Sequence, residues 1–252
     1  KCIILVKMRI LTWNIAALPS RINLYRDPNK VIYNIIDKII ELNPNIICLQ
    51  EVFDYNIQKI ICNSLKYTNY YSHISYNDKN NFISKNGLLT ASNYNIIDSD
   101  ELDYSNFTGP EYLIKKGLLT TKLDYNNTDL YIHNTHLQSN SLAYYTSICE
   151  QNRRKQHREI INKLIKYEED FNILCGDIND DYNTSQITNF FNNLPFKDTI
   201  YNNEKLVTFN KNNEQLDYIV LNKKYGKVNY DIYDTSLNKL SDHNILICDI
   251  DM

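Results

Sequence analysis

The sequence predicts a layered α/β fold. Short apolar runs that suit buried strands alternate with segments in which isoleucines recur at helical spacing, and this order is typical of sheets covered by helices. Hydrophobic residues make up 43% of the 252 residues, which is enough for a sizeable core. No low-complexity linker divides the chain, so we expect a single domain over residues 1–252.

The first half of the chain predicts two strand–helix pairs. In order, the predicted elements are a strand over residues 9–14, a helix over 28–42, a strand over 46–49 and a helix over 57–65. Pro28 suits the first turn of a helix, and Asn43-Pro44 stops this one because proline disfavours helical geometry in the residue before it. Asn14 and Gln50-Glu51 therefore come at the carboxyl ends of the two strands.

The second half is richer in strands. Residues 87–92 and 117–123 look like two edge strands of similar design, with a polar connection from Asp98 to Lys116 between them. The later elements are a strand over 130–136, a loop over 139–152, a helix over 153–166, a strand over 173–175, a short helix over 187–194 and strands over 216–221 and 244–250. Asn134 and His136 share one face of their strand, because side chains alternate along a strand.

Charge and hydropathy exclude some classes of protein. The formal net charge of −3 gives no global basic field, so a nucleic-acid partner would need a local basic patch. No run approaches the roughly 18 apolar residues of a membrane span. The chain begins with Lys1 rather than Met, so secretion stays open.

The six cysteines indicate the redox compartment. No two lie within four residues of each other, so the chain has no cysteine-pair zinc signature. Cys48, Cys175 and Cys248 sit inside apolar runs, where a free thiol behaves as a small hydrophobic group. We therefore expect a reduced protein that is cytoplasmic or otherwise intracellular, and we expect a monomer.

The central candidate for a site is the stretch 172–179. Ile173 to Cys175 forms an apolar run, and Gly176 permits a close backbone approach or an unusual turn. If strand geometry continues, Asp177 and Asn179 leave on the same face. A carboxylate and a carboxamide on one edge suit a phosphate with a hard cation, although a strand that runs into an Asp/Asn turn is the alternative.

Further polar residues lie at the ends of apolar strand runs or inside them, where sites of α/β proteins assemble. Together with the central stretch they are Asn14, Glu51, His136, Asp177 with Asn179, Asp217, and Asp242-His243. Asp217 stands inside the apolar run 216–221, and a buried carboxylate is costly unless it is paired. His243 is the natural partner.

Each of the other positions has a structural alternative. Asn14 and Asp242-His243 could be turn residues, because Asn and Asp are common in turns. Glu51 could cap the helix that follows it. His136 could be a hydrogen-bonded core histidine.

The order of these motifs resembles the endonuclease/exonuclease/phosphatase superfamily of metal-dependent phosphodiesterases. The matching motifs span residues 9–247 and are Leu11-Thr-Trp-Asn14, Leu49-Gln-Glu51-Val, Asn134-Thr-His136-Leu, Gly176-Asp177-Ile-Asn179, Leu216-Asp217-Tyr-Ile and Ser241-Asp242-His243. The resemblance implies a four-layered α/β sandwich, in which two mostly antiparallel sheets lie between helices. The site would lie at one end of the sandwich.

The resemblance also implies a metal site. Glu51 would be the principal ligand of Mg²⁺, and Asn14 and Asp242 would lie close to the metal or to its waters. Mn²⁺ is a possible substitute for Mg²⁺. This agrees with the chemistry of Mg²⁺, which prefers oxygen ligands and keeps several waters, so that one or two carboxylates suffice.

The catalytic roles are carried over in the same way. Asp217 would hold His243, which acts as general base on the attacking water. Asp177 and Asn179 would orient water and phosphate, and His136 would stabilise the phosphoryl transition state. Whether Asp177 or His243 takes the proton stays open.

Local matches suggest the substrate. Four local patterns are similar to the neutral sphingomyelinase branch: residues 50–54, residues 134–139, Gly87-Leu-Leu with Lys116-Gly117-Leu-Leu, and Arg154-x-Gln156-x-x-Glu159. The first hypothesis is therefore a sphingomyelin-like phospholipid. Tyr144-Tyr145 could contact a membrane surface.

Two other functions compete with this one. The first alternative is a DNA or RNA nuclease or a DNA-end repair enzyme, whose phosphate contacts could come from a basic cluster. That cluster consists of Arg153, Arg154, Lys155, His157 and Arg158. A non-catalytic binding module is the third hypothesis, and the intact motif positions argue against it.

Overall fold

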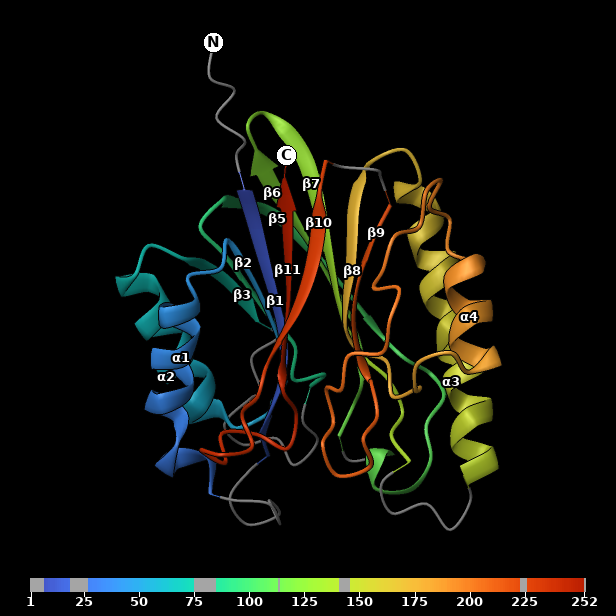
Figure 1. Cartoon of the computed structure of the whole chain (residues 1–252), viewed down its shortest axis with the longest axis horizontal. Helices are drawn as coiled ribbons and strands as arrows, with labels where there is room; N and C mark the ends of the chain where they lie inside the picture. The colour runs from blue at the N-terminus through green and yellow to red at the C-terminus, as the bar shows by residue number, and fades with distance from the viewer. Residues whose placement is uncertain are drawn as a thin grey trace.

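Two β-sheets pack face to face, and helices cover the outer face of each sheet (Figure 1). α1 (Ile32–Leu42) and α2 (Tyr55–Tyr67) cover one sheet, and α3 (Thr146–Leu164) and α4 (Ser185–Asn192) cover the other. This computed structural model describes residues 7–18, 27–74, 85–112, 114–140, 146–222 and 226–251. The predicted four-layered α/β sandwich is confirmed.

Each sheet contains one parallel pair of strands, and its other neighbours are antiparallel. The first sheet has the order β10-β11-β1-β2-β4-β3, formed by β1 (Lys7–Ala17), β2 (Ile46–Val52), β3 (Tyr71–Ile74), β4 (Leu89–Ser92), β10 (Val228–Tyr233) and β11 (Ile245–Asp251). The second has the order β5-β6-β7-β8-β9, formed by β5 (Asn95–Asp103), β6 (Gly117–Tyr125), β7 (Thr128–His136), β8 (Phe171–Asp177) and β9 (Asp217–Leu221). The parallel pairs are β1 with β2 and β7 with β8.

The core follows from the alternation of side chains along the strands. On β8, Ile173 and Cys175 face the first sheet, whereas Leu174 packs against the helices of the outer layer. On β1, Met8 and Ile10 likewise lie between the sheets. The period of a strand is two residues, so Thr12 on β1 and Asp177 on β8, which come next on these faces, also point into the space between the sheets.

At one level the space between the sheets becomes polar. The side-chain amide of Gln50 donates to Thr12 Oγ1 at 3.0 Å and to Asn134 Oδ1 at 2.8 Å, and all three residues are fully buried. The Asn134 amide in turn donates to the carbonyl of Leu49 at 3.1 Å. We call Thr12, Gln50 and Asn134 the polar layer. Its hydrogen bonds join the two sheets, two residues before Asn14 on β1 and two residues before His136 on β7.

Several element boundaries differ from the prediction. α3 begins at Thr146, inside the predicted loop 139–152, and β5 extends into the predicted polar connection as far as Asp103. Both segments are rich in polar residues, so neither carries a clear apolar pattern. The strands predicted as edges, β4 and β6, lie inside their sheets, and their nearly continuous burial agrees with that place. β1 continues beyond Asn14 to Ala17.

Some predictions fall outside these observations. Tyr144-Tyr145 lies outside the described residues, and the single domain over residues 1–252 stays a prediction. Among the described residues, no helix has both the length and the apolar character needed to cross a bilayer.

Candidate active site

Three of the predicted site residues lie side by side across the second sheet. In the strand register, His136 of β7 pairs with Asp177 of β8, and Asp177 pairs with Asp217 of β9. Paired positions point to the same face of a sheet, and here that face is the one turned to the first sheet. We call these residues the site row. None of them is more than 1% exposed.

Asp177 lies at the centre of the site. Its Oδ2 atom is 3.1 Å from Asn14 Nδ2, 3.3 Å from His136 Nε2 and 3.8 Å from His243 Nε2. Burial alone would raise the pKa of Asp177, but the electrostatic interaction and hydrogen bond with His136, and the interactions with His243 and Lys116, outweigh it and hold the pKa well below its usual range. The carboxylate is therefore ionised near neutral pH.

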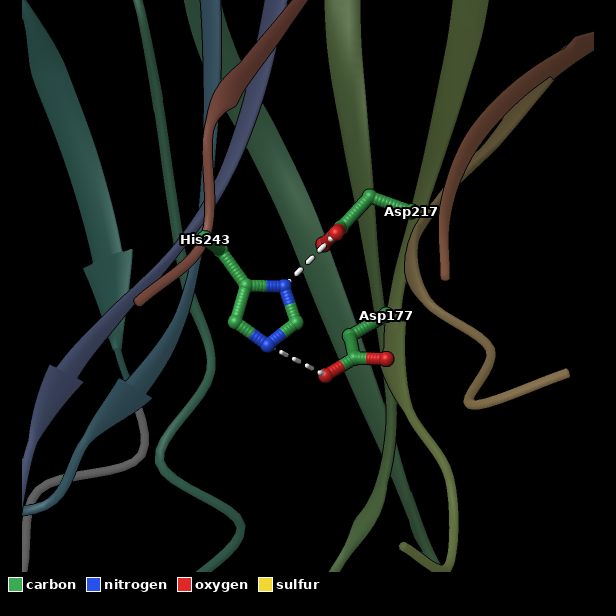
Figure 2. Close-up of side chains that lie close together, drawn as sticks. All are labelled: Asp177, Asp217 and His243. Carbon is green, nitrogen blue, oxygen red and sulfur yellow. Dashed lines mark hydrogen bonds and ion pairs between the residues drawn. The ribbon is translucent and has the colours of Figure 1, made fainter. Parts of the chain in front are cut away.

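His243 and Asp217 form a hydrogen-bonded pair (Figure 2). His243 Nδ1 lies 2.7 Å from Asp217 Oδ2, and the other ring nitrogen faces Asp177. Burial would lower the pKa of His243, but the carboxylates of Asp217 and Asp177 raise it to about 10. A histidine oriented by a buried aspartate is the arrangement of a general acid or base.

The side chains of Asp177, Asp217 and His243 also lie close enough together to hold a metal ion. Asp177, Asp217 and His243 each offer one ligand atom, and these atoms lie within 4.8 Å of one another. The Nδ1 atom of His243 is already engaged with Asp217 at 2.7 Å. That hydrogen bond, together with the preference of Mg²⁺ for oxygen ligands, favours proton chemistry at this pair.

The first sheet contributes Asn14 and Glu51. Asn14 continues the inward face of β1, and its Nδ2 atom donates to Glu51 Oε1 and to Asp177 Oδ2, both at 3.1 Å. The period of β2 would turn Glu51 toward the helices with Ile47 and Leu49. A left-handed backbone at Glu51, with φ of +57°, breaks this alternation. Its Oε1 atom lies 4.0 Å from His136 Nε2.

Asn179 and Asp242 lie at the border of the site. β8 ends at Asp177, and Asn179 has φ of +56° and donates its backbone N–H to Asp177 Oδ1 at 3.0 Å. The expected continuation of the strand is therefore wrong, and the alternative of an Asp/Asn turn describes this corner. Asp242 is half-buried, and its Oδ1 atom lies 3.4 Å from the Ser241 hydroxyl, which donates to the carbonyl of Asn14.

The helix-cap alternative for Glu51 is wrong. α2 begins after Asp54, whose side chain accepts hydrogen bonds from the backbone N–H groups of Asn56 at 2.9 Å and Ile57 at 3.1 Å. Asp54 is therefore the cap residue.

Lys116 belongs to this group; its pattern Lys116-Gly117-Leu-Leu was part of the resemblance, but it was not predicted as a site residue. It is only 4% exposed, and its Nζ atom lies 2.8 Å from His136 Nε2. The available signal was its position directly before Gly117, which pairs with His136 in the sheet. Nothing in the sequence pattern alone aligns these two strands.

The predicted basic cluster on α3 is divided by the fold. Arg153 and His157 are buried, at 2% and 5% exposed, whereas Arg154, Lys155 and Arg158 are exposed. Arg154 and Arg158 line a cavity of about 800 Å³ between α3 and α4, and no residue of the site lines it. The cluster therefore does not form a basic patch at the candidate site.

Carboxylates, an asparagine and histidines thus meet between the two sheets of the sandwich. The sequence model of the Endonuclease/Exonuclease/phosphatase family matches residues 11–243. The chain belongs to this family, whose members are metal-dependent phosphodiester hydrolases. No curated protein sequence matches the chain.

Solved structures show the same fold at low sequence identity. A beta toxin from Staphylococcus aureus is similar, with a TM-score of 0.81, 18% identity and coverage of 96% of this chain and 99% of that chain. Sphingomyelinase C from Streptomyces griseocarneus has a TM-score of 0.78, 15% identity and coverage of 97% and 99%. A humanized TDP2 of D. rerio has a TM-score of 0.72, 16% identity and coverage of 98% and 99%.

Proposed function

We propose that this protein hydrolyses a phosphodiester with the help of a bound divalent cation. The observation that carries the proposal is the buried His243–Asp217 pair, at 2.7 Å, whose second ring nitrogen faces the ionised carboxylate of Asp177. A histidine held in this way can exchange a proton with the attacking water at Nε2, while Asp217 fixes the ring and its tautomer.

The residues at this end of the sheets fit Mg²⁺, with Mn²⁺ as a substitute. Glu51 and Asp242 would supply carboxylate oxygens, which are ligands that a hard cation prefers. Asn14 would lie beside the ion and hold the Glu51 carboxylate through Nδ2, since its amide oxygen already accepts a hydrogen bond from the backbone N–H of Ala16 at 3.0 Å. The left-handed conformation that turns Glu51 away from the pattern of its strand supports this role. A bound cation would neutralise charge on the phosphodiester and polarise its phosphorus centre. A beta toxin variant of the same fold has been crystallised with bound magnesium ions.

His136, Asp177 and Asn179 bind and orient the substrate. His136 would stabilise the phosphoryl oxygens that gain charge in the transition state. Removal of one such donor from an enzyme typically costs about 3–4 kcal/mol of transition-state stabilisation. Asp177 and Asn179 would orient the attacking water and the phosphate.

The proposed substrate is a sphingomyelin-like phospholipid. The motifs at 50–54 and 134–139 and the likeness to a sphingomyelinase C support it. Nucleic acid is the second candidate, because the similar TDP2 fold is also known in complex with a single-stranded DNA product. The position of the exposed arginines of α3, away from the site, favours the lipid.

A substrate panel tests the proposal. Purified protein with Mg²⁺ would be offered sphingomyelin vesicles, plasmid DNA, an abasic-site duplex and a 5′-tyrosyl oligonucleotide. Turnover of lipid without nicking of DNA supports the first candidate, and the reverse result supports the second. Hydrolysis of none of them, nor of the generic diester bis(p-nitrophenyl) phosphate, would leave the non-catalytic module as the better description.

Two variants test whether a measured activity depends on His243 and Asp217. His243→Ala removes the proton-transfer group, and Asp217→Asn removes the carboxylate that orients it, so each should lower kcat by roughly 10²- to 10⁴-fold. Steady-state kinetics on the active substrate would measure the loss, and circular dichroism would verify the fold. Activity within a few-fold of wild type in folded His243→Ala would contradict the assigned role.

A further inference from the structure

Lys116 is fixed beside the site by its backbone. The next residue, Gly117, pairs with His136 in the register of β6 and β7. A Cβ atom at Gly117 would lie 2.3 Å from the carbonyl oxygen of Leu102, so β6 and β5 approach closely only because this residue is glycine. The carbonyl of Lys116 accepts a hydrogen bond from Tyr104 N at 3.0 Å. The side chain therefore starts next to the carboxyl end of β7.

The ammonium group of Lys116 has three close polar neighbours. Nζ lies 2.8 Å from His136 Nε2, 2.6 Å from the carbonyl oxygen of Leu137 and 3.0 Å from Glu111 Oε1. A lysine has three N–H donors, so these contacts use all of them. Asn179, at the border of the site, donates to the same Leu137 carbonyl at 2.9 Å. The cation thus lies inside the group of site residues.

The contacts around His136 cannot all be satisfied at once. Nε2 lies 2.8 Å from the Lys116 ammonium, which only donates, and 3.3 Å from the Asp177 carboxylate, which only accepts. One ring nitrogen either accepts or donates a hydrogen bond. Among the described residues, no group bonds to the other ring nitrogen, Nδ1, which is buried. An anionic oxygen that entered here would accept from Lys116 and from a protonated Nε2 together.

We propose that Lys116 is a phosphate-binding residue of this site and that its ammonium contacts a non-bridging oxygen of the bound phosphoryl group beside His136. This inference rests on the proposed function and adds a substrate contact to it. The chemistry recognised is an anionic phosphate oxygen, since a charge-assisted hydrogen bond to such an oxygen is among the strong ones available to a lysine.

Glu111 is the positioning residue for Lys116. Its Oε1 atom accepts from Lys116, and also from the backbone N–H and the hydroxyl of Ser139, both at 2.8 Å. Ser139 follows His136 by three residues on the same chain segment. The stretch 134–139 therefore supplies the histidine and also anchors the carboxylate that keeps the lysine next to it. Glu111 is itself only 7% exposed.

Binding of inorganic phosphate in the presence of Mg²⁺ tests the proposal without requiring turnover. Isothermal titration would compare wild type with Lys116→Met, Lys116→Arg and the control Lys115→Met. Lys115 is the adjacent lysine, partly exposed and paired with Asp103 at 2.9 Å. We expect Lys116→Met to weaken phosphate binding roughly 10- to 100-fold, Lys116→Arg to retain much of it, and Lys115→Met to bind as wild type does.

Further measurements distinguish a contact with phosphate from a structural role. Lys116→Met leaves the Glu111 carboxylate buried without its cation, so the double variant Lys116→Met/Glu111→Gln would be measured beside it. Mg²⁺ affinity and melting temperature close to wild type in the double variant, with phosphate affinity still reduced, support the proposal. Phosphate affinity that stays at the wild-type value, or that falls only in step with the melting temperature and Mg²⁺ affinity, overturns it.

Kinetics separate this inference from the proposed function. If wild type hydrolyses bis(p-nitrophenyl) phosphate and Lys116→Met keeps both its kcat/KM and its phosphate affinity, the inference fails and the hydrolase stands. If wild type binds phosphate through Lys116 but hydrolyses no diester, the hydrolase fails and the phosphate site stands. If wild type binds no phosphate with Mg²⁺ present, the inference is overturned.

Discussion

At the scale of single residues, Glu51 has an unfavourable backbone conformation and lies near another carboxylate. Glu51 adopts φ of +57°, a region that side chains other than glycine, asparagine and aspartate rarely occupy. Such a conformation costs about 1–3 kcal/mol. The carboxylate of Glu51 is also held at the same Asn14 amide as that of Asp177, and like charges repel.

Replacement of Glu51 by asparagine is therefore expected to stabilise the metal-free protein. Asparagine tolerates left-handed backbone and carries no charge, so we expect the free energy of unfolding to rise by about 1 kcal/mol. Urea unfolding in the presence of a chelator would measure it. Glu51→Gln removes the charge but keeps the unfavourable backbone, so the difference between the variants isolates the backbone contribution. A Glu51→Asn variant less stable than Glu51→Gln would contradict this account.

A buried histidine outside the site makes stability depend on pH. His133 is fully buried between Thr120 Oγ1 at 3.0 Å and Asn172 Oδ1 at 2.9 Å. Burial lowers the pKa of His133 from 6.5 to about 4. The unfolded chain therefore binds a proton below pH 6.5 that the folded chain accepts only near pH 4, so stability is lost as pH falls through this window.

The variant His133→Gln should weaken this dependence, because glutamine can donate to Asn172 and does not titrate. Urea unfolding at pH 7.0 and pH 4.5 would show a smaller loss of stability in the variant, by up to roughly 3 kcal/mol. His157, whose pKa burial lowers to about 3, leaves some pH dependence in both proteins. An identical loss in both proteins would show that His133 is not the group responsible.

At the scale of elements, one arginine connects a helix to two loops of the site. Arg153 of α3 donates through Nε to Asp180 Oδ1 at 2.9 Å and through Nη1 to the carbonyl of Gln138 at 3.0 Å. Gln138 follows β7 and Asp180 follows β8, which carry His136 and Asp177. The helix layer on the outer face thus holds the loops next to the site row.

Loss of this arginine is expected to destabilise the protein strongly. Arg153→Met removes the cation paired with the buried carboxylate of Asp180, a loss that typically costs about 3–5 kcal/mol of unfolding free energy. His157 Nε2, 3.6 Å from Asp180 Oδ2, would be a weak substitute. Arg154→Met, at the next and exposed position of the same helix, should stay within about 0.5 kcal/mol of wild type. Urea unfolding would compare them, and Arg153→Met/Asp180→Asn should recover part of the loss. Equal stability of the two single variants would contradict the assignment.

These elements also show how far the sequence predicts the fold. The apolar run 173–175 and the isoleucines of residues 28–42 identified their strand and helix, because local pattern decides their burial. Arg153 is buried only because Asp180 and Gln138 meet it, and these partners lie 27 and 15 residues away along the chain. Lys116 depends in the same way on the pairing of β6 with β7. Polar residues that are buried by distant partners leave no periodic signal.

At the scale of the whole molecule, the site lies between the two sheets. Asn14 and Glu51 come from the first sheet and the site row from the second, and the Asn14 amide contacts a carboxylate on each side at 3.1 Å. The motif order led us to expect that distant residues meet here, and contacts do join Asn14 to Glu51 and Asp177, and Asp177 to the two histidines. The strand register that aligns them could not be derived from it, because register depends on the pairing of complete strands.

Mg²⁺ should therefore raise the thermal stability of the protein. A ligand at 100 times its dissociation constant stabilises the folded state by about 2.7 kcal/mol, which corresponds to roughly 5–10 °C in a chain of this size. Differential scanning calorimetry with Mg²⁺ and with a chelator would measure the shift. Glu51→Gln, which lacks the proposed principal ligand, should show little of it. An equal shift in both proteins would place the ion elsewhere.

The alignment of His136, Asp177 and Asp217 on three neighbouring strands has a practical consequence. A slip of one residue between two of these strands would send the side chains of one of them toward the helices, while the overall secondary structure stayed almost the same. Spectroscopic helix and strand content would hardly detect such misassembled molecules. A functional titration of the site would count only correctly assembled ones, so it can serve as a gauge of native yield when the protein is refolded from inclusion bodies.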